Sequence, residues 1–384
     1  MSTEHRAYLF AGGGTGGHLF PGLAVAEHVI TLEAAAGRPS PACVFLASDR
    51  AIDRRILGEA RLGGQPVRFE PTGAAPFVVT PRGIARFAAG WGRTVRQTRE
   101  MIRALRTEGR EVRVVALGGF VAAPAVQGAR VERSPVTMLN LDAVPGLANR
   151  WISKRVSAVF TSAEVEDPIA HGRHPWTQIP PIVRSEAIAP GDAEACRTAL
   201  GLDPHLPTLV VTGASQGARS INRLMGEILT REPDALRGWQ VFHQTGQDEV
   251  EQTRDAYRAA GVPARVETFI ARMGVVWGAA DLAVSRAGAG SVAEVWANRV
   301  PAVLMPYPYH KDQHQRLNAR VLERSGGAIV VEDRIEATPN MEYAGATIVG
   351  LLRDSSKRAT MRGALAALGP ANGAERVAMA LVEG

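Results

Sequence analysis

Cysteine is nearly absent from this chain, which has only Cys43 and Cys196 among its 384 residues. Two cysteines cannot build a disulfide framework, and the sequence holds no Cys-x-x-Cys pair of the kind that binds metal. Both residues stand in apolar or helical contexts, so we predict inert thiols. A disulfide scaffold and a cysteine-based metal centre are therefore excluded.

Long apolar runs are missing as well. The first run, residues 7–10, leads directly into glycines, and no stretch is long enough to cross a bilayer. The N-terminal residues also lack the basic segment and apolar core of a secretion signal. We therefore expect a cytoplasmic protein without a membrane-spanning helix.

Aromatic residues make up only 5% of the chain, and lysine is scarce, so arginine supplies most of the formal net charge of +6. A basic surplus attracts phosphates, anionic lipid or nucleic acid and does not choose between them. Glycine is plentiful, which is typical of α/β proteins with tight strand-to-helix turns. The length suits two domains.

Short apolar runs alternate with helix-length segments along the whole chain. We predict strands at 7–10, 42–46, 112–116, 136–139, 208–212, 240–243, 264–268, 282–285, 302–305 and 328–331, with helices that include 22–35 and 92–105. Such alternation predicts α/β domains with parallel sheets and right-handed crossovers. Prolines interrupt the pattern near residue 180. We therefore predict one domain over 1–185 and a second over 186–364, with a helix at about 365–384 returning to the first.

The first predicted strand ends in a glycine loop, residues 12–18, and we expect a helix to start around Pro21. Glycines let another molecule approach the backbone closely, and a helix N-terminus favours an anion. His18 closes the loop and could act as a general base. Two alternatives stay open: a tight turn without a ligand, or a dinucleotide site of an oxidoreductase with Asp49 on the ribose.

The second half has three further polar strand ends. Residues 213–219 and 286–294 form glycine turns that open helices, and Glu294 could accept hydrogen bonds from ribose hydroxyls or merely complement a helix dipole. Residues 306–315 end in a polar run that suits sugar hydroxyls. Ligands of doubly wound sheets bind beyond the carboxyl ends of the strands, so these segments predict a ligand site.

Residues 77–105 combine apolar bulk with arginine. Ile84, Phe87 and Trp91 stand among several arginines, of which Arg82 and Arg86 come first. This pattern favours a helix at the surface of an anionic membrane, although an ordinary amphipathic helix with a solvated basic face fits it equally.

Six segments, in one order along the chain, resemble the MurG family of N-acetylglucosamine transferases. They are 12–22, 118–121, 143–150, 213–219, 286–294, and His314-Gln315 with Asn318. The resemblance implies a GT-B fold, in which two doubly wound Rossmann-like domains face each other across a cleft. It also implies an inverting transfer from UDP-GlcNAc to undecaprenyl-linked lipid I in peptidoglycan synthesis, without a bound metal or other cofactor. The expected location is peripheral, on the anionic cytoplasmic face of the inner membrane, and no nucleic acid partner is expected.

The resemblance also assigns residues to the donor and the acceptor. The donor positions are Thr15, Gly16, Gly17, Arg184, Ser215, Gln216, Gly217, Phe269, Ile270, Met273, Arg286, Gly288, Ala289, Gly290, Ser291, Glu294, His314 and Gln315. The acceptor positions are Gly13, Gly14, Gly118, Gly119, Phe120 and Asn149. Within the donor set, residues 269–273 would lie near the uracil, Ser215 and Arg286 near phosphate, and Glu294 on the ribose.

The main departure from the family lies at residues 139–142, and smaller ones lie at Ala122-Ala123 and Pro180-Pro181. Where the family usually has His-Glu-Gln-Asn, this chain has Leu139-Asn140-Leu141-Asp142. The imidazole and carboxylate that the family places at the acceptor are thus missing, and His18 and Asp142 remain as candidate catalytic bases. Two alternatives follow: a related transferase with another lipid or glycan acceptor, or a catalytically impaired sugar-nucleotide-binding homologue.

Overall fold

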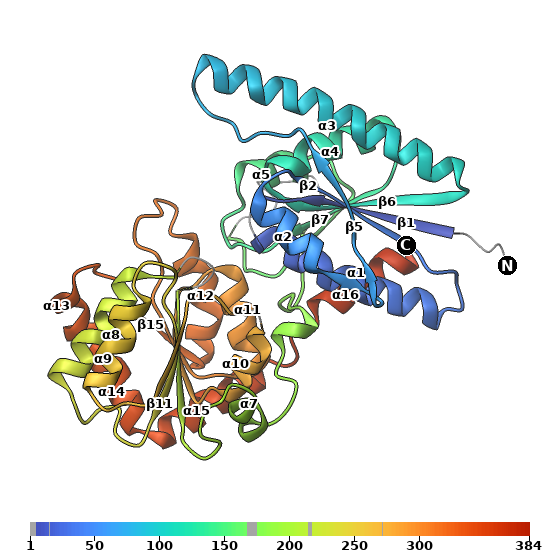
Figure 1. Cartoon of the computed structure of the whole chain (residues 1–384). Helices are drawn as coiled ribbons and strands as arrows, with labels where there is room; N and C mark the ends of the chain where they lie inside the picture. Colours follow the sequence, from blue (N-terminus) through green and yellow to red (C-terminus); the bar gives the residue numbers. More distant parts are fainter. Residues whose placement is uncertain (1–4, 15, 167–174, 214–216, 271) are drawn as a thin grey trace. The chain divides into compact units, whose positions relative to one another are not determined.

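Figure 1 shows the computed structural model, which describes residues 5–14, 16–166, 175–213, 217–270 and 272–384. The chain divides into two compact units. The first comprises Met1–Ile182 together with Asn372–Gly384, and the second comprises Val183–Ala371. The boundary predicted at about residue 185 lies close to this division. The returning segment is shorter than the predicted 365–384, because residues 365–371 stay in the second unit.

The described part of the first unit is built on a seven-stranded parallel sheet in the order β5-β2-β1-β6-β7-β8-β9. Its strands are β1 (His5–Gly12), β2 (Ala42–Ser48), β5 (Arg68–Thr72), β6 (Arg110–Gly118), β7 (Val136–Asn140), β8 (Ala158–Thr161) and β9 (Thr177–Gln178). Its helices are α1 (Gly16–Ala35), α2 (Ala51–Glu59), α3 (Pro81–Thr107), α4 (Gly119–Val131), α5 (Leu147–Ser153) and α16 (Gly373–Glu383). The short strands β3 (Arg61–Leu62) and β4 (Gln65–Pro66) form a separate antiparallel pair.

The described part of the second unit holds a six-stranded parallel sheet in the order β12-β11-β10-β13-β14-β15. Its strands are β10 (Thr208–Thr212), β11 (Gln240–Gln244), β12 (Ala264–Glu267), β13 (Leu282–Ser285), β14 (Ala302–Leu304) and β15 (Ala328–Val330). Its helical segments are η1 (Ser185–Ala187), α7 (Ala193–Ala199), α8 (Arg219–Arg231), α9 (Val250–Ala259), α10 (Met273–Ala279), α11 (Ala289–Asn298), α12 (His314–Ser325), α13 (Ala337–Asn340), η3 (Met341–Gly345), α14 (Ala346–Arg353) and α15 (Ser355–Ala367).

The predicted fold class is confirmed, since both units are parallel α/β sheets with helices on their faces (Figure 1). All ten predicted strands are present within about two residues at each end. The sequence predicts these strands because a strand that is covered on both faces of its sheet consists of a continuous apolar run. Residues 7–11 of β1, for example, are fully buried.

Two helix boundaries were wrong. Helix α1 begins at Gly16 and not near Pro21, so the proline lies inside the helix and His18 lies in its first turn. The sequence predicts a start at this proline because proline is frequent at the first helical position. Helix α3 begins at Pro81, eleven residues before the predicted start. The Thr80 hydroxyl caps this end by accepting a hydrogen bond from the Gly83 amide at 3.0 Å, and proline suits the first helical position.

The C-terminal helix α16 completes the core of the first unit by packing against α1 (Figure 1). Its buried side chains are Ala374, Val377, Ala378, Leu381 and Val382. Arg113 of β6 donates a 2.6 Å hydrogen bond to the carbonyl of Leu381, and Arg38 donates one of 3.3 Å to that of Val382. Apolar burial and charged donors at its carboxyl end thus both hold α16 on the first unit.

None of the helices within the described ranges is long and apolar enough to cross a membrane. Cys196 is buried and Cys43 half-buried, and both are free thiols. Burial raises the pKa of Cys43 to about 12, so its reactive thiolate is not populated near neutral pH.

Candidate functional site

In the first unit, two glycine turns meet around His18. The loop after β1 and the turn after β6 lie at the same edge, because β1 and β6 are parallel neighbours. Gly118 and Gly119 have positive φ angles of 97° and 75°. A Cβ atom added to Gly118 would lie 3.2 Å from His18 Cδ2, and one on Gly119 would lie 3.3 Å from His18 Nδ1. Only glycine therefore leaves room for the imidazole here.

The protonation of His18 follows from its surroundings. Burial lowers the pKa of the imidazole, while the nearby charge of Asp142 and a hydrogen bond with the backbone of Gly13 act in the opposite direction. Because burial dominates, the ring is neutral near pH 7. If the Gly13 carbonyl accepts one ring N–H, the other nitrogen carries a lone pair. The arrangement can accept a proton, as a general base must.

A buried carboxylate beneath the first glycine loop was not predicted. Asp53 of α2 is fully buried, and its Oδ2 accepts hydrogen bonds from the Gly14 amide at 2.7 Å and the Ser48 hydroxyl at 2.5 Å. A Cβ atom on Gly13 would lie 2.5 Å from that oxygen. Asp53 therefore fixes the loop and occupies the Gly14 amide. Asp49, the candidate for the ribose of a dinucleotide, is exposed and pairs with Arg54.

The altered segment 139–142 has mixed surroundings. Leu139 is buried in the core, where the family offers an imidazole. Asn140 donates to the carbonyl of Asp142 at 2.8 Å and accepts from Asn149 at 3.1 Å. Asn149 also faces Gly118, since a Cβ atom there would lie 2.8 Å from Asn149 Oδ1. Asn140 thus replaces a family carboxylate with a structural amide, while Asp142 is half-buried within electrostatic range of His18.

Phe120 extends this acceptor cluster to the first loop. Its Cε1 would lie 2.8 Å from a Cβ atom on Gly14, so its ring rests on the Gly14 backbone. The structure therefore brings together the predicted acceptor positions and His18. Gly16 and Gly17, predicted for the donor, lie in the first turn of α1 beside His18. Three predicted donor positions, Thr15, Ser215 and Gln216, lie outside the described residues.

In the second unit, the loop before α8 is packed tightly at Gly217. This residue has a φ angle of 74°, and a Cβ atom on it would lie 2.0 Å from the carbonyl oxygen of Thr245. Asn222 of α8 donates to the same oxygen at 3.1 Å. Gly217 is thus required by packing, and a contact with a donor phosphate stays a prediction.

The glycine turn after β13 leads into α11 and Glu294. Gly288 and Gly290 face open space, because a Cβ atom on either would meet no described atom within 4 Å. With Ala289 and Ser291 they form the start of α11. The indole of Trp277 donates a 2.8 Å hydrogen bond to Glu294 Oε2. One carboxylate oxygen is therefore held in place.

The charge state of Glu294 is set by competing effects. Burial raises the pKa of this carboxyl group, and the indole hydrogen bond and the charge of Arg184 lower it. Arg184 itself pairs with Glu186 at 3.2 Å. A partly desolvated carboxylate beside an open helix start is suited to accept hydrogen bonds from hydroxyl groups of a ligand.

Arg286 is bonded to three other residues of the second unit. Its guanidinium is buried and donates to Asp333 at 2.6 Å, to the Met305 carbonyl at 3.0 Å and to the Ser220 hydroxyl at 2.9 Å. Asp333 in turn accepts from Ser220 at 2.6 Å and from Asn340 at 2.8 Å. The positive charge is thus compensated inside the protein. Arg286 holds three segments of the carboxyl edge together, and direct phosphate contact stays a prediction.

The residues predicted for the uracil lie after the edge strand β12. Phe269 is exposed, whereas Ile270 and Met273 pack against the core cluster that contains Trp277. Strands β10 and β11 separate β12 from β13 in the sheet. Helix α10 connects the two places, because Met273 begins it and Trp277, which holds Glu294, belongs to it.

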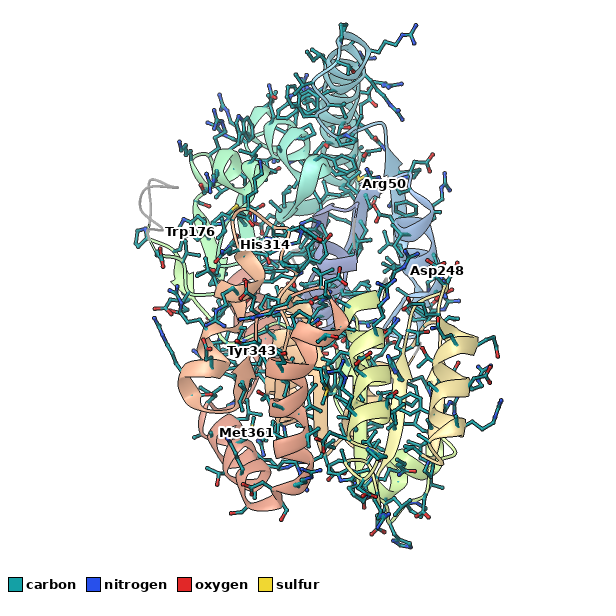
Figure 2. All side chains as sticks on the ribbon, turned by 90° about the vertical axis from the view of Figure 1, so that its left-hand side faces the viewer. Arg50, Trp176, Asp248, His314, Tyr343 and Met361 are labelled. Atoms are coloured by element: carbon teal, nitrogen blue, oxygen red, sulfur yellow. The ribbon has the colours of Figure 1, made fainter. Side chains whose placement is uncertain are left out.

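The polar loop after β14 is internally bonded. Nδ1 of His314, labelled in Figure 2, lies 2.8 Å from Asp312 Oδ1, and its ring stacks on that of His310 at 4.3 Å. The side-chain oxygen Oε1 of Gln315 accepts a hydrogen bond from the Tyr307 amide at 2.9 Å. Hydrogen bonding by His314 lowers the pKa of Asp312. Both predicted sugar-binding side chains are therefore oriented by their neighbours.

The proposed membrane helix is α3. Ile84, Arg82 and Arg86 are exposed near its start, whereas Phe87 and Trp91 are half-buried in a series of ring contacts that ends on Trp151. Three exposed apolar residues lie in the predicted segment 77–105 but were not named as membrane contacts: Phe77, Val78 and Val79, the last of them 82% exposed. The two aromatic residues of the predicted patch are thus largely used in packing, and the preceding loop carries the exposed apolar surface.

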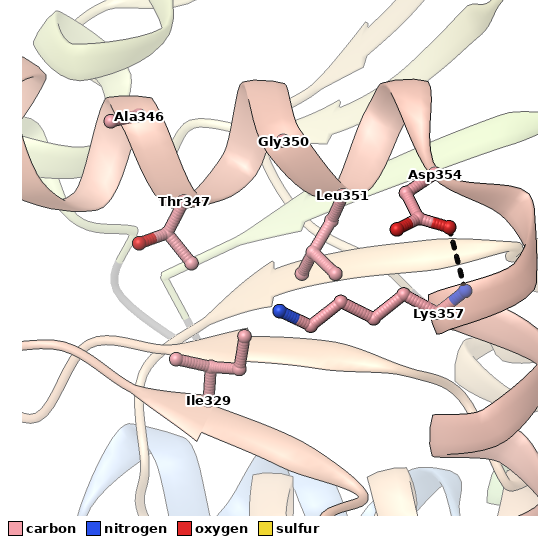
Figure 3. Close-up of a pocket in the computed structure, with 7 residues that line it drawn as sticks. All are labelled: Ile329, Ala346, Thr347, Gly350, Leu351, Asp354 and Lys357. Atoms are coloured by element: carbon pink, nitrogen blue, oxygen red, sulfur yellow. Dashed lines mark hydrogen bonds between the residues drawn. The ribbon is translucent and has the colours of Figure 1, made fainter.

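A separate hollow of about 310 Å³ lies between β15 and α14 in the second unit (Figure 3). Ile329, Thr347, Leu351 and Lys357 are among its lining residues. No residue predicted for the donor, the acceptor or the membrane lines it.

The chain matches two family models. The glycosyltransferase family 28 N-terminal domain matches residues 8–161, and the glycosyltransferase family 28 C-terminal domain matches residues 208–376. Among solved structures, that of Acinetobacter baumannii MurG is similar with a TM-score of 0.68 and 23% identity, covering 98% of this chain and 99% of that one. A UDP-glucosyltransferase from Polygonum tinctorium gives 0.65 at 13% identity, covering 100% and 96%. These likenesses show the fold.

Curated relatives match over nearly the full length. A protein of Clavibacter sepedonicus is 38% identical, covering 97% of this chain and 94% of the relative. One from Geobacter metallireducens is 32% identical, covering 91% and 90%. Both are named UDP-N-acetylglucosamine–N-acetylmuramyl-(pentapeptide) pyrophosphoryl-undecaprenol N-acetylglucosamine transferase. The resemblance found in the sequence motifs is confirmed, and the chain belongs to glycosyltransferase family 28 and, within it, to the MurG family.

Proposed function

We propose that this chain transfers N-acetylglucosamine from UDP-GlcNAc to the C4 hydroxyl of the muramoyl sugar of undecaprenyl-linked lipid I. The product is lipid II, the disaccharide precursor of peptidoglycan. Relatives that carry this activity in their names match nearly the whole chain. The observation that carries the proposal within the structure is His18, a neutral imidazole enclosed by the two glycine turns of the first unit.

The reaction would be a single displacement with inversion. The C4 oxygen attacks the anomeric carbon while the bond from that carbon to the diphosphate oxygen breaks. The hydroxyl proton passes to His18, and UDP leaves with the bonding electron pair. A positioned base of this kind contributes about 10²–10⁴-fold to the rate. Asp142 would stabilise the imidazolium that forms, because its charge already favours the protonated ring.

The leaving diphosphate needs compensation of its growing negative charge. Helices α8 and α11 both begin at glycine-containing turns of the second unit, and their amides and dipoles supply partial positive charge there. Arg286 would contribute less than a free guanidinium, because Asp333 compensates its charge. We propose that no metal ion or other cofactor is required for this step.

The test is turnover of lipid I with UDP-GlcNAc, followed by mass analysis of the lipid product. We expect His18→Ala to lower turnover at least ~10²-fold with donor affinity nearly unchanged, and Asp142→Asn to lower it as well. Near-parental turnover of both variants would remove them as candidate bases. Binding of UDP-GlcNAc without any product from lipid I would favour a different acceptor or an impaired homologue.

We also propose that the protein acts peripherally at the cytoplasmic face of the inner membrane. Phe77, Val78, Val79 and Ile84 offer exposed apolar surface next to Arg82 and Arg86, which suits an anionic interface. Replacing the four apolar residues with Ser should reduce co-sedimentation with anionic vesicles while turnover of a soluble acceptor persists. Val131→Ser, at an exposed site on α4, is the matched control. Equal co-sedimentation of parent and variant would contradict the idea.

A further inference from the structure

Arg50 contacts both parts of the acceptor cluster. It precedes α2, but its side chain does not cap that helix. Instead the guanidinium donates a 3.3 Å hydrogen bond to the carbonyl of Gly14 in the first glycine loop. It also lies 5.1 Å from the ring centroid of Phe120, which follows the Gly118–Gly119 turn. Figure 2 labels this residue.

The charges around the loop give Arg50 its significance. Asp53 is buried beneath the loop and takes the Gly14 amide, so that amide is not available to an anion. Asp142 is a second acid in electrostatic range of His18. Arg50 forms no ion pair with any residue that the structure describes, and the neighbouring Asp49 is engaged by Arg54. An anion at this loop would need a cation to offset these acids, and Arg50 is held in the position to supply it.

We propose that Arg50 binds the diphosphate group of the acceptor. This inference rests on the proposed function, because lipid I carries a diphosphate between its sugar and its prenyl chain. A guanidinium presents a planar fork of N–H donors that matches phosphate oxygens, and it keeps its charge at all working pH values. The Gly14 carbonyl and the Phe120 ring hold the fork, which reduces the entropy lost when the acceptor binds. Arg50 is a binding residue, and His18 remains the base.

The test uses Arg50→Gln and Arg50→Lys, with Arg55→Gln as the matched control, because Arg54→Gln would release Asp49 beside Arg50. Gln keeps a donor for the Gly14 carbonyl and removes the charge, whereas Lys keeps the charge and loses the fork. Arg55 lies in α2, is exposed, and pairs with Glu59 at 3.4 Å. Steady-state turnover gives KM for lipid I, KM for UDP-GlcNAc and kcat for each variant.

For Arg50→Gln we expect KM for the acceptor to rise about tenfold or more, with kcat and donor KM nearly unchanged, because a charged hydrogen bond to a ground-state group is lost. Arg50→Lys should fall between the parent and Arg50→Gln, and Arg55→Gln should match the parent. An unchanged acceptor KM would overturn the proposal. A rise in donor KM alone would assign Arg50 to the donor diphosphate, and a loss of kcat alone would make it a support of the loop.

A binding measurement separates this inference from the proposed function. Calorimetric titration of the full chain with inorganic pyrophosphate, with the donor site filled by UDP, needs no turnover. We expect the dissociation constant to be about tenfold larger in Arg50→Gln than in the parent or Arg55→Gln. Equal affinities would overturn the role of Arg50. Weaker affinity combined with no turnover of lipid I by the parent would instead refute the proposed acceptor.

Discussion

Replacing Glu294 with Gln tests the donor site at one hydrogen-bonding group. The Trp277 indole donates a 2.8 Å hydrogen bond to one carboxylate oxygen. A Gln side chain offers its amide oxygen to the same donor, so the side chain should keep its orientation. The second oxygen, which we propose accepts from the ribose, becomes an amide NH₂ and can no longer accept.

The size of the effect follows from these contacts. A hydrogen bond to a charged group contributes about 1.5–3 kcal/mol. Burial already raises the pKa of Glu294, so part of the cost of desolvating the carboxylate is present before the ligand arrives. We therefore expect Glu294→Gln to weaken the affinity for UDP by about 10–100-fold, which corresponds to roughly 1.4–2.8 kcal/mol. Glu294→Ala, which also leaves the indole without a partner, should weaken the binding of UDP by ~1–3 kcal/mol.

Isothermal titration with UDP at several pH values is the assay. In the parent, affinity should fall as pH decreases through the raised pKa of Glu294, because the protonated carboxyl accepts hydrogen bonds poorly. This decline should be absent in Glu294→Gln. Glu251→Gln, at an exposed position on α9, controls for the loss of one negative charge. Parental affinity for UDP in the Glu294→Gln variant would refute the ribose assignment.

Three further outcomes are expected. Gly119→Ala should lower turnover at least ~10-fold without changing UDP affinity, because its Cβ atom would lie 2.7 Å from the Gly13 carbonyl and 3.3 Å from His18. The control Gly58→Ala, whose Cβ atom would meet open space, should keep parental turnover, and equal kinetics of the two variants would contradict the enclosure of His18. The buried His243 has a pKa lowered to about 3, so below the unfolded value of about 6.5 each pH unit destabilises the folded chain by about 1.4 kcal/mol. The urea midpoint of the parent should therefore fall between pH 7 and pH 4.5, and it should fall less steeply in His243→Gln. Parallel curves would show that another group is responsible. Excess EDTA should leave the initial rate of transfer unchanged, and a loss that Mg²⁺ restores would show that the enzyme needs a metal.

The sequence predicted the sheets well because their strands are buried on both faces. Residues 7–11 of β1 and 208–212 of β10 form apolar or small-residue runs that differ clearly from the helices between them. The position of His18 was also predictable, since a glycine loop at a strand end places the next side chain at the ligand-binding edge. The start of α1 was not, because Pro21 resembles a first helical residue although it lies inside the helix.

The residues missed by sequence reasoning owe their roles to partners far along the chain. Ser220 and Asp333 are hydrogen-bonded across 113 positions, and Gly14 and Asp53 across 39. No local pattern of residue types marks such a pair. The same holds for Arg286, whose motif suggested phosphate binding although Asp333 compensates its charge. The pattern of strands and glycine turns therefore predicted that the site lies at the carboxyl ends of the strands. Tertiary packing determines which charged side chains there are paired within the protein.

The return of α16 to the first unit has a consequence for the order of folding. During synthesis, residues up to Ile182 emerge before any of the second unit, but the helix that covers the apolar face of α1 emerges last. Until then Val377 and Leu381 are not there to bury that face, and Arg113 has no Leu381 carbonyl to bind. The half that begins the chain thus reaches its final stability only after the other half has been made. A released chain truncated after residue 371 should therefore show protease resistance in the second unit and susceptibility around α1.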